Sequence, residues 1–158
     1  MTKLSNADLT QLISAAMDSP RKRSHHSLHS SLDAKVQRLA IAMEPDTYVR
    51  PHRHPQTWEL YIPMRGAFKV VLFNEAGVVT ESFQIGENGI AAYEMPANTW
   101  HSMVSLQSGG IIFEVKEGPY VQPGIADVGA WSPAEGNLEV ATFRQFLLGA
   151  QPGDRYAD

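Results

Sequence analysis

The chain has 158 residues, a length that fits one domain, with 43% hydrophobic and 19% charged residues. Its net charge of -4 argues against a nucleic acid or an anionic membrane as the main partner, because both favour basic surfaces. The sequence contains no cysteine, which excludes disulfides, thiolate metal sites and cysteine nucleophiles, so that a metal site would need nitrogen and oxygen ligands. No signal-like apolar stretch opens the chain, and we expect a cytoplasmic protein with a single domain over residues 1–158.

Residues 1–35 are expected to form a helix followed by a polar segment. Apolar residues at positions 9, 12, 13, 16 and 17 follow helical spacing, and Ser5 with Asp8 forms a capping signal before them. This pattern predicts an amphipathic helix of about three turns that ends at Ser19-Pro20. The stretch 21–29 is rich in arginine, serine and histidine. We expect it to be a loop or a sheet edge, with its histidines in solvent or near a pocket.

Residues 36–118 have the pattern of an all-β domain. Short apolar or alternating runs are separated by turn residues, as in a sandwich or a barrel. The expected strands cover residues 36–43, 48–54, 59–64, 67–73, 78–85, 90–94, 101–106 and 111–116. Glycine and asparagine in the connections supply the positive φ that tight turns need. About eight strands at this spacing predict a double-sheet jelly roll.

Residues 119–158 are predicted to be irregular at first and then helical. Ser132, Pro133 and Glu135 have the arrangement of a helix start, with a cap, a proline at the first position and a capping-box glutamate. The pattern predicts a helix over residues 133–148, although Gly136 weakens its first turn. We expect this C-terminal helical segment to pack against the barrel.

The most informative segment of the sequence is 51–59. Side chains alternate faces along a strand, so His52 and His54 should point the same way and lie close enough to share one ion. Glu59 enters the next predicted strand after a short turn and can add an oxygen ligand. His101 begins a later strand and offers a third imidazole. Together they would hold a divalent metal with one or two positions open for water or substrate.

The spacing of these residues resembles the two-part signature of the cupin superfamily. The first motif, H-x-H-x4-E-x6-G, covers residues 52–66, and the second, P-x-x-x-x-H, covers residues 96–101. The resemblance implies a double-stranded β-helix, the jelly-roll cupin barrel, and it implies a homodimer. It also implies metal binding by His52, His54, Glu59 and His101. Asn98 stands where the second motif has a glycine, and asparagine tolerates the left-handed backbone conformation.

A narrower resemblance covers most of the chain. The sequence is similar to the WbuC family of cupin-fold metalloproteins, which is named for its association with bacterial O-antigen polysaccharide gene clusters. The matching segments are residues 21–29, 33–38, 45–55, 65–66, 113–120 and 131–135. This resemblance implies the fold, the metal site and a link to polysaccharide biosynthesis, but it does not specify a reaction.

Several other polar residues are candidates for contact with a substrate. Arg50 shares strand parity with His52, so its guanidinium should face the same cavity and hold a carboxylate or phosphate, or else pair with a carboxylate as a structural residue. His29 matches the narrower family and is a second substrate-binding candidate. Tyr61 and Tyr48 are the catalytic candidates, because a tyrosine hydroxyl near a metal can donate a proton.

The last predicted strand of the barrel leaves one choice open. Glu114 and Lys116 alternate with Phe113 and Val115, so only one of the two pairs can face the core. If the apolar pair faces the core, the charged pair lies on the surface.

These observations predict a metal-binding cupin, with a small-molecule metalloenzyme as the leading hypothesis. The reaction could be an isomerisation, an epimerisation or a dioxygen-dependent oxidation. Nitrogen and oxygen ligands suit iron, manganese, nickel, cobalt and zinc alike, so the metal is not specified. The expected partner is a small molecule, with no nucleic acid and no membrane. The alternative is a non-catalytic module that binds a sugar or another small ligand.

Overall fold

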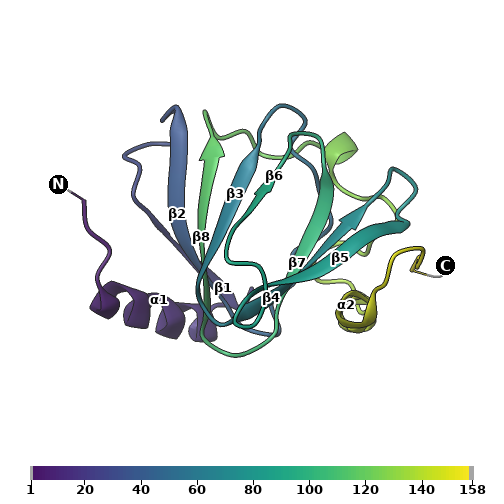
Figure 1. Ribbon diagram of the computed structural model, residues 1–158, viewed down its shortest axis with the longest axis horizontal. Helices are drawn as coiled ribbons and strands as arrows, with labels where there is room; N and C mark the ends of the chain where they lie inside the picture. Colours follow the sequence, from purple (N-terminus) through teal and green to yellow (C-terminus); the bar gives the residue numbers. More distant parts are fainter. Residues whose placement is uncertain (1, 157–158) are drawn as a thin grey trace.

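The computed structural model describes residues 2–156, and its strands form two antiparallel sheets. The elements are α1 (Asn6–Asp18), β1 (Arg23–Ser27), β2 (Val36–Met43), β3 (Glu59–Arg65), β4 (Ala67–Phe73), β5 (Val79–Gly86), β6 (Tyr93–Met95), β7 (Trp100–Ser105), β8 (Gly110–Glu117), η1 (Ile125–Asp127) and α2 (Val140–Gly149). The larger sheet has the order β1-β2-β8-β3-β6, and the smaller has β5-β4-β7. Figure 1 shows α1 and α2 on opposite sides of the molecule, outside the two sheets. No helix within residues 2–156 has the length and apolar character needed to cross a membrane.

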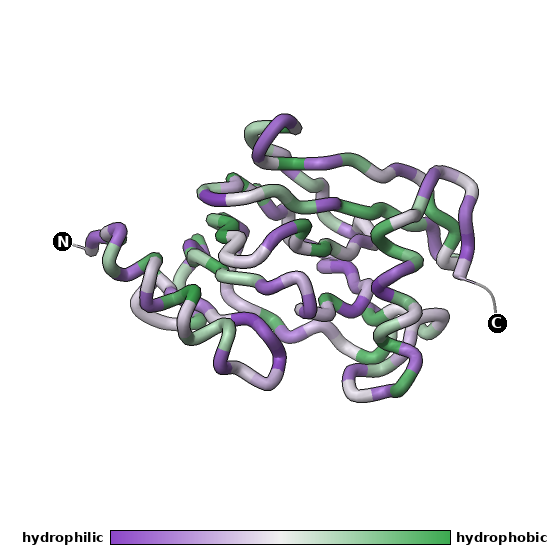
Figure 2. Tube along the Cα trace, turned by 90° about the horizontal axis from the view of Figure 1, so that it is seen from below, coloured by the Kyte–Doolittle hydropathy of each residue, from purple (hydrophilic) through white to green (hydrophobic). Residues whose placement is uncertain are grey.

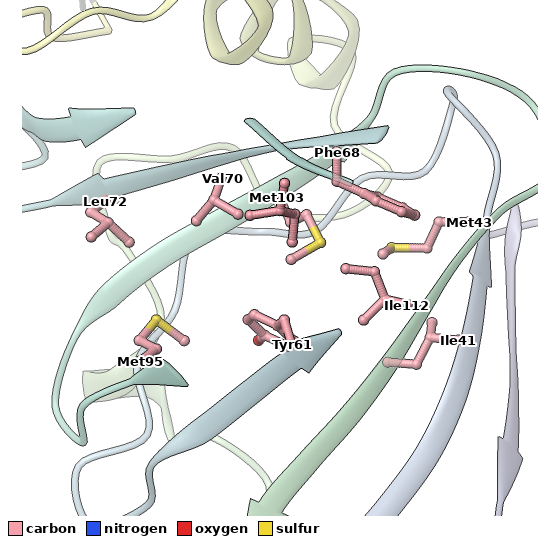
Figure 3. Close-up of a cluster of buried hydrophobic side chains, with 10 residues drawn as sticks. Ile41, Met43, Tyr61, Phe68, Val70, Leu72, Met95, Met103 and Ile112 are labelled. Carbon is pink, nitrogen blue, oxygen red and sulfur yellow. The ribbon is translucent and has the colours of Figure 1, made fainter. Parts of the chain in front are cut away.

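Alternation along the strands divides the apolar side chains between an inner core and two outer cores. On β4, Phe68 and Val70 point between the sheets, whereas Val71 and Phe73 point toward α2. Figure 3 shows the inner cluster, to which strands of both sheets contribute. Figure 2 shows hydrophobic and hydrophilic residues interspersed along the trace. Full burial of one such side chain contributes about 1.5–3 kcal/mol, so burial between the sheets favours their packing.

Helix α1 forms where its spacing and its capping signal predicted it. The backbone N–H of Asp8 donates to Ser5 Oγ at 3.2 Å, and the backbone N–H of Ser5 donates to the Asp8 carboxylate at 2.7 Å. Leu9, Leu12 and Ala16 pack against apolar residues of β2 and β8 on the outer face of the larger sheet. The predicted N-terminal helix is therefore confirmed.

The stretch 21–29, expected to be a loop or a sheet edge, supplies an edge strand. Strand β1 pairs with β2 in antiparallel register, from Arg23 opposite Met43 to Ser27 opposite Leu39. The side chains of Arg23, His25 and Ser27 line the space between the sheets, because alternate residues share a face.

The strand predicted over residues 48–54 is wrong. Within this stretch only His52 is paired, in isolated bridges of which one joins it to His101. Pro51 has no backbone N–H to donate to a ladder. Because no continuous strand forms, the alternation of side chains is not maintained between Arg50 and His52.

The C-terminal helix begins later than predicted, at Val140 instead of residue 133. Gly136 has a φ of +84°, a left-handed conformation that does not belong to a right-handed helix. Ser132 Oγ donates to the carbonyl of Gly129, and Glu135 pairs with Arg21, so the expected capping box does not form.

Candidate metal and ligand site

The space between the two sheets contains a cavity of about 680 Å³. Its wall includes all four predicted metal ligands, which come from the 51–54 segment, from β3 and from β7: His52, His54, Glu59 and His101. Residues that are far apart in the sequence thus meet at one place, between the larger and the smaller sheet.

Backbone pairing brings two of the histidines together. The N–H of His52 donates to the carbonyl of His101 at 3.1 Å, and the N–H of His101 donates to the carbonyl of His52 at 2.9 Å. Directly opposite residues project their side chains on the same face, and the two ring centroids are 4.4 Å apart. Asn98, with a φ of +65°, donates its N–H to the carbonyl of His54 at 2.8 Å and so fixes the third histidine.

The carboxylate of Glu59 lies at the centre of the group. Its Oε1 is 3.4 Å from His54 Nε2, and its Oε2 is 3.3 Å from His101 Nε2. The Tyr61 hydroxyl donates to Oε2 at 3.1 Å, and Lys116 Nζ donates to Oε1 at 3.2 Å. Two imidazoles, a phenol and an ammonium therefore converge on one buried carboxylate.

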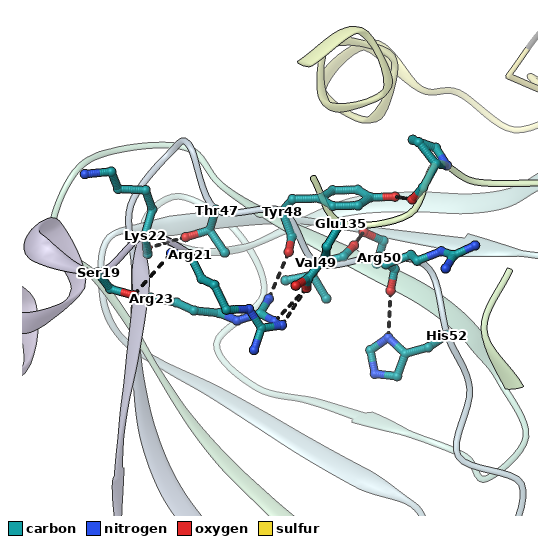
Figure 4. Close-up of polar contacts among 12 residues, drawn as sticks. Ser19, Arg21, Lys22, Arg23, Thr47, Tyr48, Val49, Arg50, His52 and Glu135 are labelled. Atoms are coloured by element: carbon teal, nitrogen blue, oxygen red, sulfur yellow. Dashed lines mark hydrogen bonds and ion pairs between the residues drawn. The ribbon is translucent and has the colours of Figure 1, made fainter. Parts of the chain in front are cut away.

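Hydrogen bonds to backbone carbonyls orient two of the imidazoles. His52 Nδ1 donates to the carbonyl of Arg50 at 2.9 Å (Figure 4), and His101 Nδ1 donates to the carbonyl of Thr99 at 3.0 Å. A neutral imidazole that carries its proton on Nδ1 has an acceptor lone pair on Nε2. Such outer hydrogen bonds are typical of metal-binding histidines, because they fix both the tautomer and the ring orientation.

The electrostatics of the site favour neutral imidazoles and an ionised carboxylate. Burial lowers the pKa of His52 to about 3 and that of His54 to about 4, and it also lowers the pKa of His101. Burial acts to raise the pKa of Glu59, but the positive charge that His101 and Lys116 can carry outweighs it, so that this pKa is lowered to about 2. These are the protonation states that metal binding requires.

The donor set fits a metal ion in its chemistry, although it is not arranged as a closed metal site. Among the side chains of residues 2–156, no group of three or more potential ligands has an arrangement that could hold an ion as it stands. In this arrangement the ammonium of Lys116, and not a metal ion, neutralises the charge of Glu59. A divalent ion at these residues would compete with the Lys116 ammonium for the same carboxylate.

On β8, the charged residues Glu114 and Lys116 face the interior, and the apolar residues Phe113 and Val115 do not line the cavity. Strand pairing places Lys116 opposite Glu59 and Glu114 opposite Tyr61, and all four side chains line the cavity. Lys116 Nζ is 2.8 Å from Glu114 Oε1. Burial raises the pKa of Glu114, whereas the two carboxylates raise the pKa of Lys116 in spite of its burial.

The outer face of β8 explains why the sequence did not settle this choice. Ile111 is fully buried and Phe113 packs beside it, but both face α1 on the outside of the larger sheet. Apolar residues therefore occur on both faces of β8, and their presence does not mark the interior. The sequence did contain one signal for the orientation of β8. The amphipathic N-terminal helix needs an apolar sheet face to pack against, and Phe113 can belong to that outer face.

The structure corrects the positions expected for Tyr48 and Arg50. Tyr48 lies in the outer core near α2, where its hydroxyl donates to the carbonyl of Pro133 at 2.8 Å and burial raises its pKa to about 12. Arg50 borders the cavity, but its guanidinium donates to the carbonyls of Gly129 at 3.1 Å and Ser132 at 3.0 Å. Figure 4 shows this guanidinium turned away from His52. Both corrections follow from the absence of a strand over residues 48–54.

His29 and Tyr61 lie in the cavity wall, where the sequence placed them. His29 Nδ1 accepts the backbone N–H of Arg38 at 2.9 Å, just beyond the end of β1. Tyr61 is buried, and burial raises the pKa of its hydroxyl well above the ordinary value. Their roles in substrate binding and in catalysis remain predictions.

Comparison with known proteins supports the fold. A family model described as a domain of unknown function, DUF6016, matches residues 4–85, and no curated protein matches the chain. The structure of KdgF from Halomonas sp. is 18% identical, with a TM-score of 0.51 over 66% of this chain and 85% of that one. The SPY1581 protein of Streptococcus pyogenes is 15% identical, with a TM-score of 0.53 over 77% and 93%. TT1209 from Thermus thermophilus is 19% identical, with a TM-score of 0.52 over 73% and 97%.

Such structural neighbours are cupin-fold proteins, and the two antiparallel sheets of this chain have the same arrangement. The predicted all-β jelly-roll cupin fold is therefore confirmed. The narrower resemblance to the WbuC family remains a prediction.

Proposed function

The chain belongs to the family described as domain of unknown function DUF6016, and we propose that it is a metal-binding cupin that acts on a small molecule. The observation that carries this proposal is the convergence of three imidazoles and one ionised carboxylate in the wall of one cavity. Burying four such polar groups is costly unless they pair with one another or bind a ligand. A metal ion would satisfy all of them at once.

The proposed metal ligands are His52, His54, Glu59 and His101. A bound divalent ion would act as a Lewis acid that polarises a carbonyl or lowers the pKa of water. Tyr61 is the proposed proton donor because its hydroxyl lies beside Glu59, and to serve as an acid it would have to give up its hydrogen bond to Glu59 and have its raised pKa lowered by the bound ion. Lys116 would contribute a fixed positive charge on the other side of Glu59.

The cavity supports a small-molecule ligand in preference to a macromolecule. Its volume of about 680 Å³ lies within the range of about 300–1,000 Å³ that is typical of small-molecule sites. The resemblance to the WbuC family adds a candidate source for the ligand, namely the precursors of bacterial surface polysaccharide. Isomerisation or epimerisation of a sugar and dioxygen-dependent oxidation are the reactions to assay.

Metal content tests the ligand assignment. Protein purified without added metal or chelator should contain close to one equivalent of a divalent metal by mass spectrometry, and His52→Ala/His54→Ala should lose it without unfolding. The control His25→Ala/His26→Ala removes the same number of imidazoles from β1 and should retain the metal. Equal metal in the two double variants would contradict the assignment.

A non-catalytic binding module is the second candidate, and one contact favours it. Lys116 already neutralises Glu59, so the site is balanced in charge without a metal. A module would be stabilised by its ligand in thermal denaturation and would not convert it, whereas an enzyme would show turnover that depends on the metal. Failure to take up any metal on incubation would favour the module.

A further inference from the structure

Two arginines in the cavity wall share one carboxylate oxygen. Arg21 Nη2 is 2.5 Å and Arg23 Nη2 is 3.1 Å from Glu135 Oε1, and Figure 4 shows both guanidinium groups converging on Glu135. All three side chains line the same cavity as the candidate metal ligands. The Arg23 side chain is only 13% exposed, and its Nη1 donates to the carbonyl of Tyr48 at 2.9 Å. This second hydrogen bond holds the guanidinium in place independently of Glu135.

Glu135 is held less firmly than Arg23, which also donates to the backbone carbonyl of Tyr48. Within residues 2–156, its carboxylate has no hydrogen-bond partner other than Arg21 and Arg23, and its side chain is 44% exposed. The next residue, Gly136, has a left-handed φ, and a Cβ at this position would meet no atom within 4 Å. The carboxylate therefore lies on an exposed turn, with open space beside Gly136 into which it could move.

The cavity gains an excess of positive charge when Glu135 leaves it, although the protein as a whole carries -4. Its cationic groups are Arg21, Arg23 and Lys116, since the guanidinium of Arg50 at the cavity border is bonded to backbone carbonyls. Its carboxylates are Glu59, Glu114 and Glu135. If Glu135 moves out, three cations face two carboxylates. A concave wall with one predominant sign of charge attracts ligands of the opposite sign.

We infer that Arg21 and Arg23 form a subsite for an anionic group of the ligand, a carboxylate or a phosphate, and that Glu135 occupies this subsite until the ligand displaces it. Guanidinium groups bind both anions through charge-assisted hydrogen bonds, as they bind the Glu135 carboxylate here. The inference deepens the proposed function and rests on it only in assigning the cavity to a small ligand. Anion binding at the arginines does not depend on a metal.

Calorimetric titration of metal-free protein with inorganic phosphate and with malonate tests this subsite. Glu135→Gln should bind at least one of the two anions about tenfold more tightly than wild type, because an internal competitor that occupies a site about nine-tenths of the time weakens apparent affinity by that factor. Arg21→Gln/Arg23→Gln should abolish this binding. The control Glu75→Gln removes a comparable ion pair with Arg53, at 2.5 Å and outside the cavity wall, and should not change the affinity.

The comparison of the two anions identifies the ligand class. A gain for phosphate assigns the subsite to phosphorylated ligands, and a gain for malonate assigns it to carboxylates. Arg21→Gln alone removes a side chain that is 56% exposed, so it keeps the test valid if the double variant does not fold. Equal affinities in wild type and Glu135→Gln, or full binding without the arginines, would overturn the inference. Retained anion binding in a protein that takes up no metal would overturn only the metal assignment.

Discussion

Lys116 lies beside the Glu59 carboxylate, where its positive charge would affect metal binding directly. Its ammonium lies 3.2 Å from Glu59 Oε1 and 2.8 Å from Glu114 Oε1, and both carboxylates are buried. The ammonium neutralises the ionised Glu59 and also pairs with Glu114, whose pKa burial raises. A divalent ion bound to Glu59 would meet this ammonium as a like charge.

Replacing Lys116 by methionine should therefore strengthen metal binding, by at least about tenfold. Unit charges about 4 Å apart interact by on the order of 4 kcal/mol at an effective dielectric constant of about 20, so relief of even part of this repulsion reaches that factor. Competition against a fluorescent chelator measures the affinity directly. The double variant Glu114→Gln/Lys116→Met avoids leaving an unpaired buried carboxylate and serves as the control. Weaker metal binding in both variants would show that Lys116 orients Glu59 as a ligand instead of competing for it.

Residue spacing predicted which side chains meet in the cavity better than it predicted how the other residues are oriented. His52, His54 and Glu59 meet as predicted, although the strand assumed for the two histidines does not form, and His101 lies at a strand start as predicted. Tyr48 was misplaced because strand parity was extended across a stretch that has no strand. Parity holds only where a ladder keeps the backbone extended, and a single sequence does not show where the ladder stops.

The capping box of α1 shows how an element can be predicted from a few residues. The Asp8 carboxylate accepts hydrogen bonds from the hydroxyl and the backbone N–H of Ser5, and these bonds lower the pKa of Asp8 below its ordinary value. The folded protein therefore binds this proton less tightly than the unfolded chain does. The resulting stabilisation is present above the ordinary pKa of an aspartate and is lost as the pH falls through the lowered pKa.

Asp8→Asn should lower the melting temperature at pH 7, and the difference from wild type should narrow at pH 3. Thermal denaturation followed by circular dichroism at the two pH values measures it. Asp18→Asn, at the other end of the same helix, is the matched control and should show no such narrowing. A difference between Asp8→Asn and wild type that is the same at both pH values would contradict the role of the carboxylate.

Helix α2 shows the limit of predictions from local sequence. Ser132, Pro133 and Glu135 have the composition of a helix start, but the side chain of Glu135 is drawn to two arginines that precede it by more than a hundred residues. The left-handed Gly136 then separates this turn from the helix. A long-range ion pair and one glycine override a local signal, and neither partner arginine can be identified from the local pattern.

At the scale of the whole molecule, the candidate site joins the two sheets. Glu59 and Lys116 belong to the larger sheet, and His101 belongs to the smaller one. The outer faces of the sheets are covered by α1 and α2, so the space between them holds both the inner core and the cavity. The all-β class and most strand positions could be predicted from alternation and turns. The pairing of His52 with His101 could not, because it depends on how distant segments meet.

The central claim is that His52, His54, His101 and Glu59 bind one metal ion. Anomalous X-ray scattering, recorded at the absorption edge of the ion in crystals of metal-loaded protein, tests it most directly. We predict a single peak in contact with Nε2 of the three histidines and with the Glu59 carboxylate, and Lys116 paired with Glu114 alone. A peak at the histidines of residues 21–29, or the absence of any peak in the cavity of fully loaded protein, would contradict the claim.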